Sequence, residues 1–330
     1  MKAIVYAKYG SPDVLELKEV ETPAPKDDEV LIRVHAVSIN DWDLGLMDGT
    51  SFVNRLMAGL FRPKKIRILG SDVAGRIAAA GRNVKRFQVG DEVFGDLSGR
   101  WGGFAEYVCA PEPALALKPP GMTFAQAAAI PQAAMLAVQG LLDRGGLKAG
   151  QRLLINGAGG GVGTFAIQIA KLHGAEVTGV DSAAKLELMR SLGCDVVIDY
   201  KREDFTRTGA RYDLILDVKT QRSPFDCARA LGRGGTYVTV GGSMTRLVQF
   251  LLVWPLISMT SRKSMRLVML KVNKDLGYMS ELFEAGKVAP VIDEFRTLRE
   301  VPEAMRCFAA GLHKGKVVIT VDASEVIRSE

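Results

Sequence analysis

The sequence predicts an α/β protein in which a doubly wound parallel sheet follows a domain of short β-strands. From Arg152 onward, apolar strand-like runs alternate with helical segments. Up to Gly121, short runs rich in strand formers are separated by glycine and proline. The chain has 330 residues, which is too long for one small core and suits two domains.

The first region is expected to contain many short strands with turns between them. Glu29 to Val37, for example, alternates apolar and polar residues as a half-buried strand does. Such a series favours a sandwich or a partly closed barrel. Ser51 to Phe61 is an apolar insertion without a clear period. The expected strands are Lys2 to Lys8, Val14 to Val20, Glu29 to Val37, Asp72 to Ala80, Glu92 to Phe94, Phe104 to Val108 and Ala114 to Leu117.

The second region begins with a helical pattern at Ala127 to Gln139. Its strands are continuously apolar, which indicates a parallel sheet covered on both faces. Asp181 or Ser182 would cap one helix, and Ser223 would cap another that starts with a proline. The expected strands are Arg152 to Asn156, Glu176 to Val180, Val196 to Tyr200, Leu214 to Val218, Thr236 to Val240 and Arg266 to Leu270, and a helix at Lys271 to Gly286 leads out of this region. The last segment, Val288 to Val321, would add a strand, a helix near Val301 to Ala310 and the closing strand Lys316 to Val321.

A glycine cluster joins the strand at Arg152 to a helix that begins near Thr164. Three small residues lie where a dinucleotide-binding turn needs them, for the tight turn, for approach of the pyrophosphate and for helix packing. The N–H groups of the new helix would face the diphosphate. Asp181 closes the next strand at about the expected twenty-residue offset. The cofactor-binding residues expected in the loop are Ala158, Gly160, Gly161, Val162 and Gly163.

Charge and cysteine usage exclude several classes of protein. The formal net charge is +6, but the basic residues are dispersed and no nucleic-acid motif is present, so we expect no nucleic-acid partner. The basic patches at Arg62 to Arg67 and Arg82 to Arg86 are interpreted as solvated loops. The cysteines have no close pair, which argues against a disulfide framework and predicts a cytoplasmic protein. They are Cys109, Cys194, Cys227 and Cys307.

The most apolar stretch is Leu247 to Met259, which Gln249 and Pro255 interrupt. It is shorter than the roughly 20 residues that cross a bilayer, so we expect no transmembrane segment. A lid, a buried helix and a membrane-surface segment remain open for it. The chain starts with a strand-like run, so we expect no secretory signal.

Several short motifs occur in order along nearly the whole chain. On these motifs the chain resembles the zinc-free, quinone-oxidoreductase branch of the medium-chain dehydrogenase/reductase superfamily. The resemblance implies a GroES-like β-barrel domain, residues 1–121 and 273–330, with a Rossmann domain, residues 122–272, inserted into it. It also implies catalysis in the cleft between the two domains. The motifs are Val37 to Asn40, Leu69 to Gly75, Val89 to Gly95, Gly102 to Tyr107, the glycine loop and Gly315 to Ile319.

The zinc-containing members of this superfamily hold a catalytic zinc through cysteine and histidine. Here the corresponding Gly-His-Glu element reads Gly70-Ser71-Asp72, and Asn40 to Asp43 stand where a cysteine ligand is expected. Zinc needs about three protein ligands. No histidine pair has the spacing of metal ligands, so we expect no metal. The histidines are His35, His173 and His313.

The resemblance also implies which residues surround the reactive end of the cofactor. Asn40 would donate from its amide to a substrate carbonyl, or else be a turn asparagine bonded to its own backbone. Gln132 would reach the carboxamide or lie beside a helix cap. Leu136 replaces a hydroxyl residue of many relatives, and no proton donor identifies itself. Further cofactor contacts are expected from Gly241, Gly242, Ser243, Gly315 and Lys316.

Two signals conflict over the cofactor. Asp181, with Ser182 beside it, would bind the ribose hydroxyls of NADH and repel a 2′-phosphate. Lys185 and Tyr200 match residues that hold the 2′-phosphate in NADPH-using quinone reductases, as a charge and as a hydroxyl donor. The sequence favours NADPH, with NADH as the alternative.

The function predicted is an NADPH-dependent, metal-free oxidoreductase that transfers hydride to conjugated carbonyls (enones) or quinones. Without zinc or an evident acid, nothing would take up the alkoxide of an isolated ketone. An alcohol or aldehyde oxidoreductase is the alternative, and a cofactor-binding regulatory protein without turnover is the alternative of another class. The substrate is expected to be small and apolar. Edge strand Arg266 to Leu270 predicts a homodimer.

Overall fold

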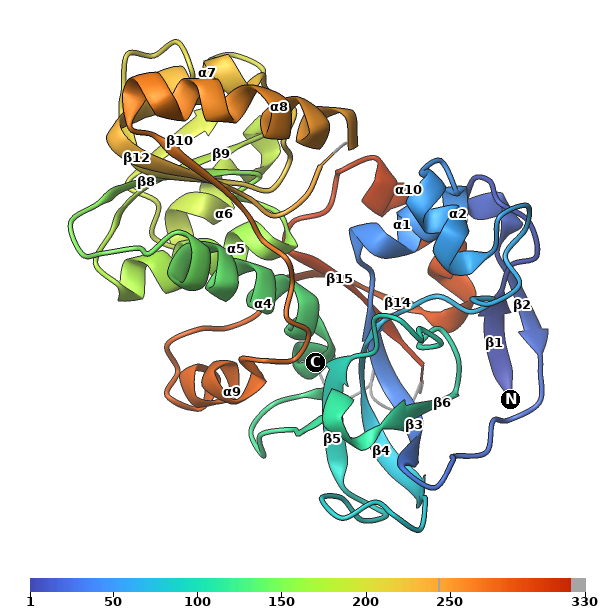
Figure 1. Ribbon diagram of the computed structural model, residues 1–330. Helices are drawn as coiled ribbons and strands as arrows, with labels where there is room; N and C mark the ends of the chain where they lie inside the picture. The colour runs from blue at the N-terminus through green and yellow to red at the C-terminus, as the bar shows by residue number, and fades with distance from the viewer. Residues whose placement is uncertain (243, 322–330) are drawn as a thin grey trace. The chain divides into compact units, whose positions relative to one another are not determined.

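The computed structural model describes residues 1–242 and 244–321, which divide into two compact units (Figure 1). The first unit comprises Met1–Gln132, Val272–Glu284 and the chain from Ile292 onward. The second comprises Ala133–Lys271 and Ala285–Val291. The second unit is thus inserted in the sequence of the first.

The first unit is built on a seven-stranded sheet. Neighbouring strands are antiparallel except β14 and β15, which run parallel. A separate antiparallel pair is formed by β1 (Lys2–Val5) and β2 (Glu16–Glu19). The order in the larger sheet is β14 (Ile292–Thr297), β15 (Lys316–Thr320), β3 (Glu29–Ser38), β4 (Asp72–Ala80), β5 (Glu92–Asp96) and β7 (Ala116–Leu117), and β6 (Tyr107–Pro111) also pairs with β3.

Short helices cover and connect these strands. The first stretch of this unit extends to Gln132, whereas the sequence suggested a boundary after residue 121. The difference arises because α3 packs on β3, β4 and β15 of the first unit. Thr123 begins α3 with a side-chain oxygen that accepts from Gln126 N. The helices of the first unit are α1 (Asp41–Asp48), α2 (Phe52–Ala58), α3 (Phe124–Ala129), α9 (Leu276–Glu284) and α10 (Val301–Ala309), and α4 (Pro131–Val138) begins at the boundary.

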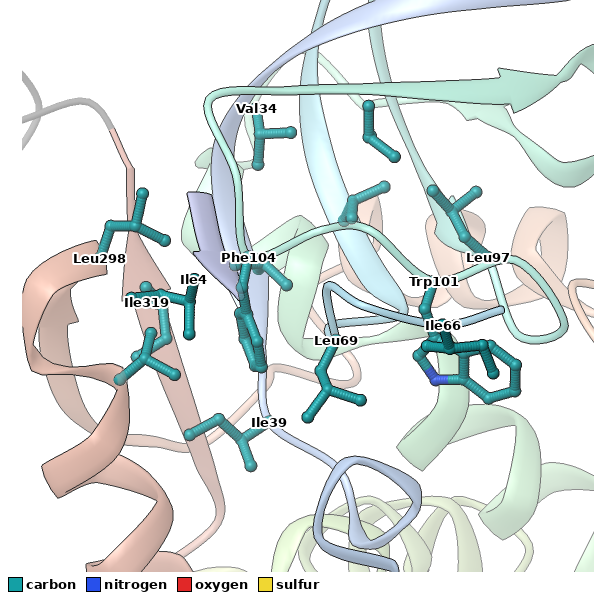
Figure 2. Close-up of a cluster of buried hydrophobic side chains, with 14 of the residues drawn as sticks. Ile4, Val34, Ile39, Ile66, Leu69, Leu97, Trp101, Phe104, Leu298 and Ile319 are labelled. Carbon is teal, nitrogen blue, oxygen red and sulfur yellow. The ribbon is translucent and has the colours of Figure 1, made fainter. Parts of the chain in front are cut away.

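The core of the first unit fixes the two loops that carry its polar residues. Ile39 and Leu69 are fully buried in one apolar cluster with Phe104 and Ile319, as Figure 2 shows. Asn40 follows Ile39 directly, and Gly70 follows Leu69. Burying a large aliphatic side chain contributes about 1.5–3 kcal/mol. The core therefore holds the backbone on which the polar groups are placed.

The second unit is a six-stranded, fully parallel sheet. Strand order reverses beside β8, which is the arrangement of a doubly wound sheet. Helix α5 (Gly161–Leu172) contacts β8 and β9, while α7 (Pro224–Ala230) contacts β12 (Figure 1). The order is β10 (Val196–Asp199), β9 (Glu176–Asp181), β8 (Arg152–Asn156), β11 (Tyr212–Asp217), β12 (Leu231–Thr239) and β13 (Ser264–Leu267), and α6 spans Leu186–Ser191.

Helix α8 (Met244–Ser261) contains the apolar stretch that the sequence left open. One side of it is buried, where Phe250 and Trp254 stack on Tyr237. Its other side exposes Leu252 and Met259, which are 72% and 82% accessible. The stretch is therefore a half-buried helix. Within the described residues, no helix is long and apolar enough to cross a membrane.

Several expected elements differ in extent from those observed. Strand β6 starts at Tyr107 rather than at Phe104, because Phe104 N bonds to Leu69 O outside the ladder. Strand β5 continues past Phe94 to Asp96. The insertion at 51–61 forms α2, whose first turn is capped by Ser51. Helix α3 ends before Pro131, so that the expected helix at 127–139 is split in two.

Candidate functional site

The glycine loop of the second unit joins β8 to α5. Gly157 has φ +89°, a left-handed conformation that other residues adopt only with strain. A side chain on Gly163 would overlap the carbonyl oxygen of Gly157, which lets α5 pack against the loop. Gly160 is the N-cap residue, so the first N–H groups of α5 lack partners within the helix. The loop therefore fits a diphosphate.

The structure adds two glycines that the fingerprint did not select. One is Gly157, for its backbone conformation. The other is Gly159, where a Cβ atom would lie 2.7 Å from Lys185 Cβ. At Gly160, a Cβ would find its nearest neighbour at 3.6 Å, so close packing within the loop does not require glycine there. The need for glycine at positions 157 and 159 is not visible from motif spacing alone, because it depends on the folded backbone.

Asp181 does not cap a helix but anchors the glycine loop. Its carboxylate accepts hydrogen bonds from Gly159 N at 3.0 Å and from Ser182 N at 2.8 Å. Lys185 Nζ lies 3.5 Å from the same carboxylate, and both side chains are buried. Ser182 precedes the next helical turn without a side-chain cap. The negative charge of Asp181 is thus offset by Lys185.

Tyr200 and the strand ends complete what the second unit offers. Tyr200 is half exposed, and its N–H donates to Asp181 O at 3.1 Å. Gly241 has open space where a side chain would be, while Gly242 at φ +127° lies against Thr220. Ser243 lies outside the described residues.

A buried hydrogen-bond network behind the ends of β8, β11 and β12 was missed by sequence reasoning. The Asp217 carboxylate accepts from Asn156 Nδ2 and from Tyr237 Oη, each at 2.8 Å. It also accepts from the backbone N–H of Thr220 at 2.7 Å. The Asp217 side chain is fully buried. The network fixes the backbone at the carboxyl edge of the sheet, which is where open sheets of this type bind ligands.

The first unit holds a separate polar cluster centred on Lys316. This lysine is 2% exposed, and its Nζ donates to Asn40 Oδ1 at 2.6 Å and to Ile39 O at 3.1 Å. Asp72 Oδ2 lies 3.7 Å from the same atom. The sequence expected Lys316 to contact the cofactor. The structure places its ammonium inside this cluster, with Gly315 before it at φ +70°.

Asp43 ties together the two loops of the first unit. Its carboxylate accepts from Asn40 N at 2.9 Å and from Gly70 N at 2.8 Å. Burial raises the pKa of Asp43 to about 6. Asn40 is the N-cap residue of α1, in a capping box with Asp43, and its Nδ2 donates to Ser71 Oγ at 3.5 Å. The Asn40 and Gly70 loops are therefore fixed relative to each other.

Asp72 and Asp96 face each other across β4 and β5, where they are direct partners in the register. Asp72 Oδ2 accepts from Gln132 N at 3.1 Å, and Asp96 Oδ1 accepts from Ser98 N at 2.7 Å. Burial, followed by the charge of Asp96, raises the pKa of Asp72, and burial also raises that of Asp96. In the described part of the chain, Asp72 Oδ1, Asp96 Oδ2 and Gln132 Nε2 are buried without a hydrogen-bond partner.

Other candidates from the sequence lie away from this cluster or have structural contacts. Tyr9 donates from its hydroxyl to Gly59 O, and Arg55 lies over its ring. Tyr107 pairs with Arg33 in the sheet. Leu136 is half-buried in α4.

Comparisons with known proteins match both units. Residues 26–120 match the model of the alcohol dehydrogenase GroES-like domain, and residues 192–319 match that of a zinc-binding dehydrogenase domain. The chain is 34% identical to a 2-methylene-furan-3-one reductase of Solanum lycopersicum, over 97% of this chain and 79% of that protein. The chain belongs to the zinc-free, quinone-oxidoreductase-like branch of the medium-chain dehydrogenase/reductase superfamily.

Two further relatives agree with this membership. An NADPH-dependent alkenal/one oxidoreductase, chloroplastic, of Arabidopsis thaliana is 34% identical, over 89% of this chain and 72% of that one. The solved structure of the quinone oxidoreductase from Coxiella burnetii superimposes with a TM-score of 0.87, at 28% identity, over 98% and 99% of the two chains. The first unit is thus the GroES-like domain, and the second is the Rossmann domain.

Where zinc-containing members of the superfamily have ligands, this chain has a lysine-centred cluster. The Lys316 ammonium is bonded to Asn40 and lies beside Asp72, and a cation there repels a metal ion. His35 stacks on Phe124, and His313 stacks on Phe308. Over residues 1–242 and 244–321, no three His, Cys, Asp or Glu side chains are placed to hold a metal. These residues do not fit zinc.

The raised pKa of Asp72 predicts a stability that falls as pH rises. A carboxyl whose pKa is higher in the folded state stabilises the fold when protonated, and this contribution is lost as pH rises through the folded-state pKa. Replacing Asp72 with Asn removes this pH-dependent loss of stability, because an amide does not ionise. The amide also supplies an N–H group. The thermal midpoint of Asp72→Asn, relative to wild type, should therefore increase between about pH 4 and about pH 7.

Asp28→Asn serves as the control, because Asp28 is exposed. Its midpoint should follow that of the wild type at every pH. A parallel pH dependence for wild type and Asp72→Asn would contradict the assignment of a raised pKa to Asp72.

Proposed function

We propose that this protein is an NADPH-dependent, metal-free reductase of conjugated enones and quinones. The observation that carries the proposal is the Asn40–Lys316–Asp72 cluster at the position where zinc would otherwise polarise a substrate. In place of a Lewis acid, the cluster supplies the amide of Asn40, which is bonded to the buried ammonium of Lys316. Two relatives, a 2-methylene-furan-3-one reductase and an alkenal/one oxidoreductase, support the same substrate class by their names.

A bound reduced nicotinamide would supply the hydride. The Rossmann domain would hold it through the glycine loop and the N–H groups at the start of α5. In the GroES-like domain, the Asn40 amide would donate a hydrogen bond to the carbonyl oxygen of the substrate. In an enone or quinone the developing charge is spread from the β-carbon to that oxygen, so that one or two neutral donors suffice.

The position of a deuterium label tests the reaction. With a reduced cofactor deuterated at C4 and an enone substrate, deuterium should appear at the β-carbon of a saturated ketone. Asn40→Ala should lower kcat by about 100- to 1000-fold, because loss of one oxyanion donor typically removes roughly 2.7–4 kcal/mol of transition-state stabilisation. Its affinity for the cofactor should change little. Deuterium at the carbonyl carbon, with an allylic alcohol as product, would indicate the alternative alcohol or aldehyde chemistry.

The cofactor is proposed to be NADPH. The buried pair of Lys185 and Asp181 supports this proposal, since the lysine offsets the carboxylate that would repel a 2′-phosphate. Asp181 also has both carboxylate oxygens bonded to loop backbone, which leaves it less able to bind ribose hydroxyls. Tyr200 follows the end of the adjacent strand and is half exposed, so its hydroxyl is a further candidate donor.

Removing the charge of Lys185 should discriminate between the two cofactors. Lys185→Ala should raise KM for NADPH by about 10- to 100-fold, as expected for a hydrogen bond to a charged group of roughly 1.5–3 kcal/mol, and leave KM for NADH nearly unchanged. Lys185→Met should behave alike while keeping the alkyl stem against Gly159. The exposed Lys201→Ala is the matched control and should change neither constant. A wild type that prefers NADH would overturn the assignment.

Independence from metal is the next expectation. Exhaustive treatment with a chelator should leave turnover unchanged, because the cluster contains no site that fits zinc. Elemental analysis should find less zinc than protein on a molar basis. Activity that disappears with the chelator and returns only with zinc would show that the ligand assignment is wrong.

A regulatory protein without turnover is the rival from another class. If NADPH raises the melting temperature but no enone, quinone or aldehyde consumes it, that rival replaces the reductase.

We further propose a homodimer through the edge strand β13 and a cytoplasmic location. The edge position of β13 in the described sheet and four free cysteines support these two proposals.

A further inference from the structure

The ammonium of Lys316 is buried among protein groups that accept its hydrogen bonds or offset its charge. It carries three N–H donors. Ile39 O and Asn40 Oδ1 accept from it at 3.1 and 2.6 Å, and Asp72 Oδ2 lies 3.7 Å away on a third side. The side chain is 3% exposed. The ammonium of Lys316 is therefore enclosed by protein groups, two of which accept its hydrogen bonds.

The neighbour that it constrains most is Asn40. The amide oxygen receives the short bond from the ammonium, so the NH2 group lies on the opposite side of the amide plane. Turning the amide by half a rotation would bring NH2 against an ammonium, replacing a hydrogen bond with repulsion between two donors. On that side Nδ2 donates to Ser71 Oγ at 3.5 Å, and the Asn40 side chain also hydrogen-bonds to the Asp72 carboxylate. The NH2 group of Asn40 therefore faces Ser71 and Asp72, away from the ammonium.

Asp72 and Asp96 keep the ammonium in place. A lone buried ammonium is strongly disfavoured unless carboxylates offset its charge. Asp72 is the nearest carboxylate, and Asp96 faces Asp72 across the β4–β5 ladder. Asp43 holds the backbone N–H of Asn40 at 2.9 Å. Backbone and side chain of Asn40 are thus fixed by different charged residues.

We propose that Lys316 is a positioning residue, which fixes the Asn40 amide so that it presents N–H rather than C=O to the substrate. The inference rests on the proposed function, in which Asn40 donates to the carbonyl oxygen of an enone. It assigns to Lys316 a role different from direct contact with the cofactor. Without Lys316, the amide would rotate freely and would offer its oxygen to the substrate in part of the population.

A double-mutant cycle on kcat tests this dependence. Lys316→Met should lower kcat for 3-penten-2-one by about tenfold, while KM for NADPH changes less than about twofold. In the Asn40→Ala background the same substitution should lower kcat by less than about twofold, because its target is already gone. Equal fold-changes in the two backgrounds would overturn the proposal.

Two further variants separate positioning from stability. Lys314→Met removes an exposed lysine two positions away and should leave kcat unchanged. If Lys316→Met does not fold, the cycle is run in the Asp72→Asn background, where the stranded carboxylate is absent. There the loss of kcat on adding Lys316→Met should persist. A full kcat in the folded Lys316→Met, Asp72→Asn protein would show that Lys316 serves the fold alone.

A measurement without turnover distinguishes failure of this inference from failure of the proposed function. In protein labelled with [15N]asparagine, the side-chain signal of Asn40 is identified by its loss in Asn40→Ala. Its NH2 hydrogens should exchange with solvent about tenfold faster in Lys316→Met than in wild type or Lys314→Met. Unchanged exchange would overturn the Lys316–Asn40 contact. If wild type shows the Lys316–Asn40 contact but reduces no enone or quinone, the positioning of the Asn40 amide by Lys316 is supported and the reductase function is rejected.

Discussion

The antiparallel pairing of β15 with β3 is the constraint on which the polar site of the GroES-like domain depends. Val318 pairs with Ser38, and the ladder continues through the bond from Ile39 N to Val317 O at 3.1 Å. This register brings Lys316 to Asn40 although 276 positions separate them in the sequence. A shift by one residue would turn Lys316 to the other face of the sheet and leave the carboxylates of the cluster without their cation.

The glycine loop of the Rossmann domain depends in a similar way on one ion pair. Asp181 holds Gly159 through its backbone N–H, while the stem of Lys185 packs against the position where a side chain on Gly159 would be. The loop shape and the charge near the ribose are therefore set by the same two residues. A substitution of Asp181 therefore also removes the acceptor that holds the backbone of the glycine loop.

Local sequence was enough to predict the parallel sheet and the loop between β8 and α5, because a buried strand, a glycine cluster and a helix are written within consecutive residues. The protein contacts of Lys316 could not be predicted in this way, because its neighbours are set by the pairing of β15 with β3. Asp96 was missed for a related reason: the apolar pattern stops at Phe94, but the ladder with β4 continues to Asp96 and places it opposite Asp72. Asp217 and its partners depend likewise on which strands become neighbours.

The split of the GroES-like domain along the sequence has a consequence for the order of events during synthesis. Asp43, Asp72 and Asp96 leave the ribosome long before Lys316, and most of the Rossmann domain is made between them. Domains generally fold as units while the chain is being made. Burying these carboxylates before their cation arrives is unfavourable, so they remain hydrated or protonated until β15 is available. The domain whose synthesis begins first therefore completes its folding last.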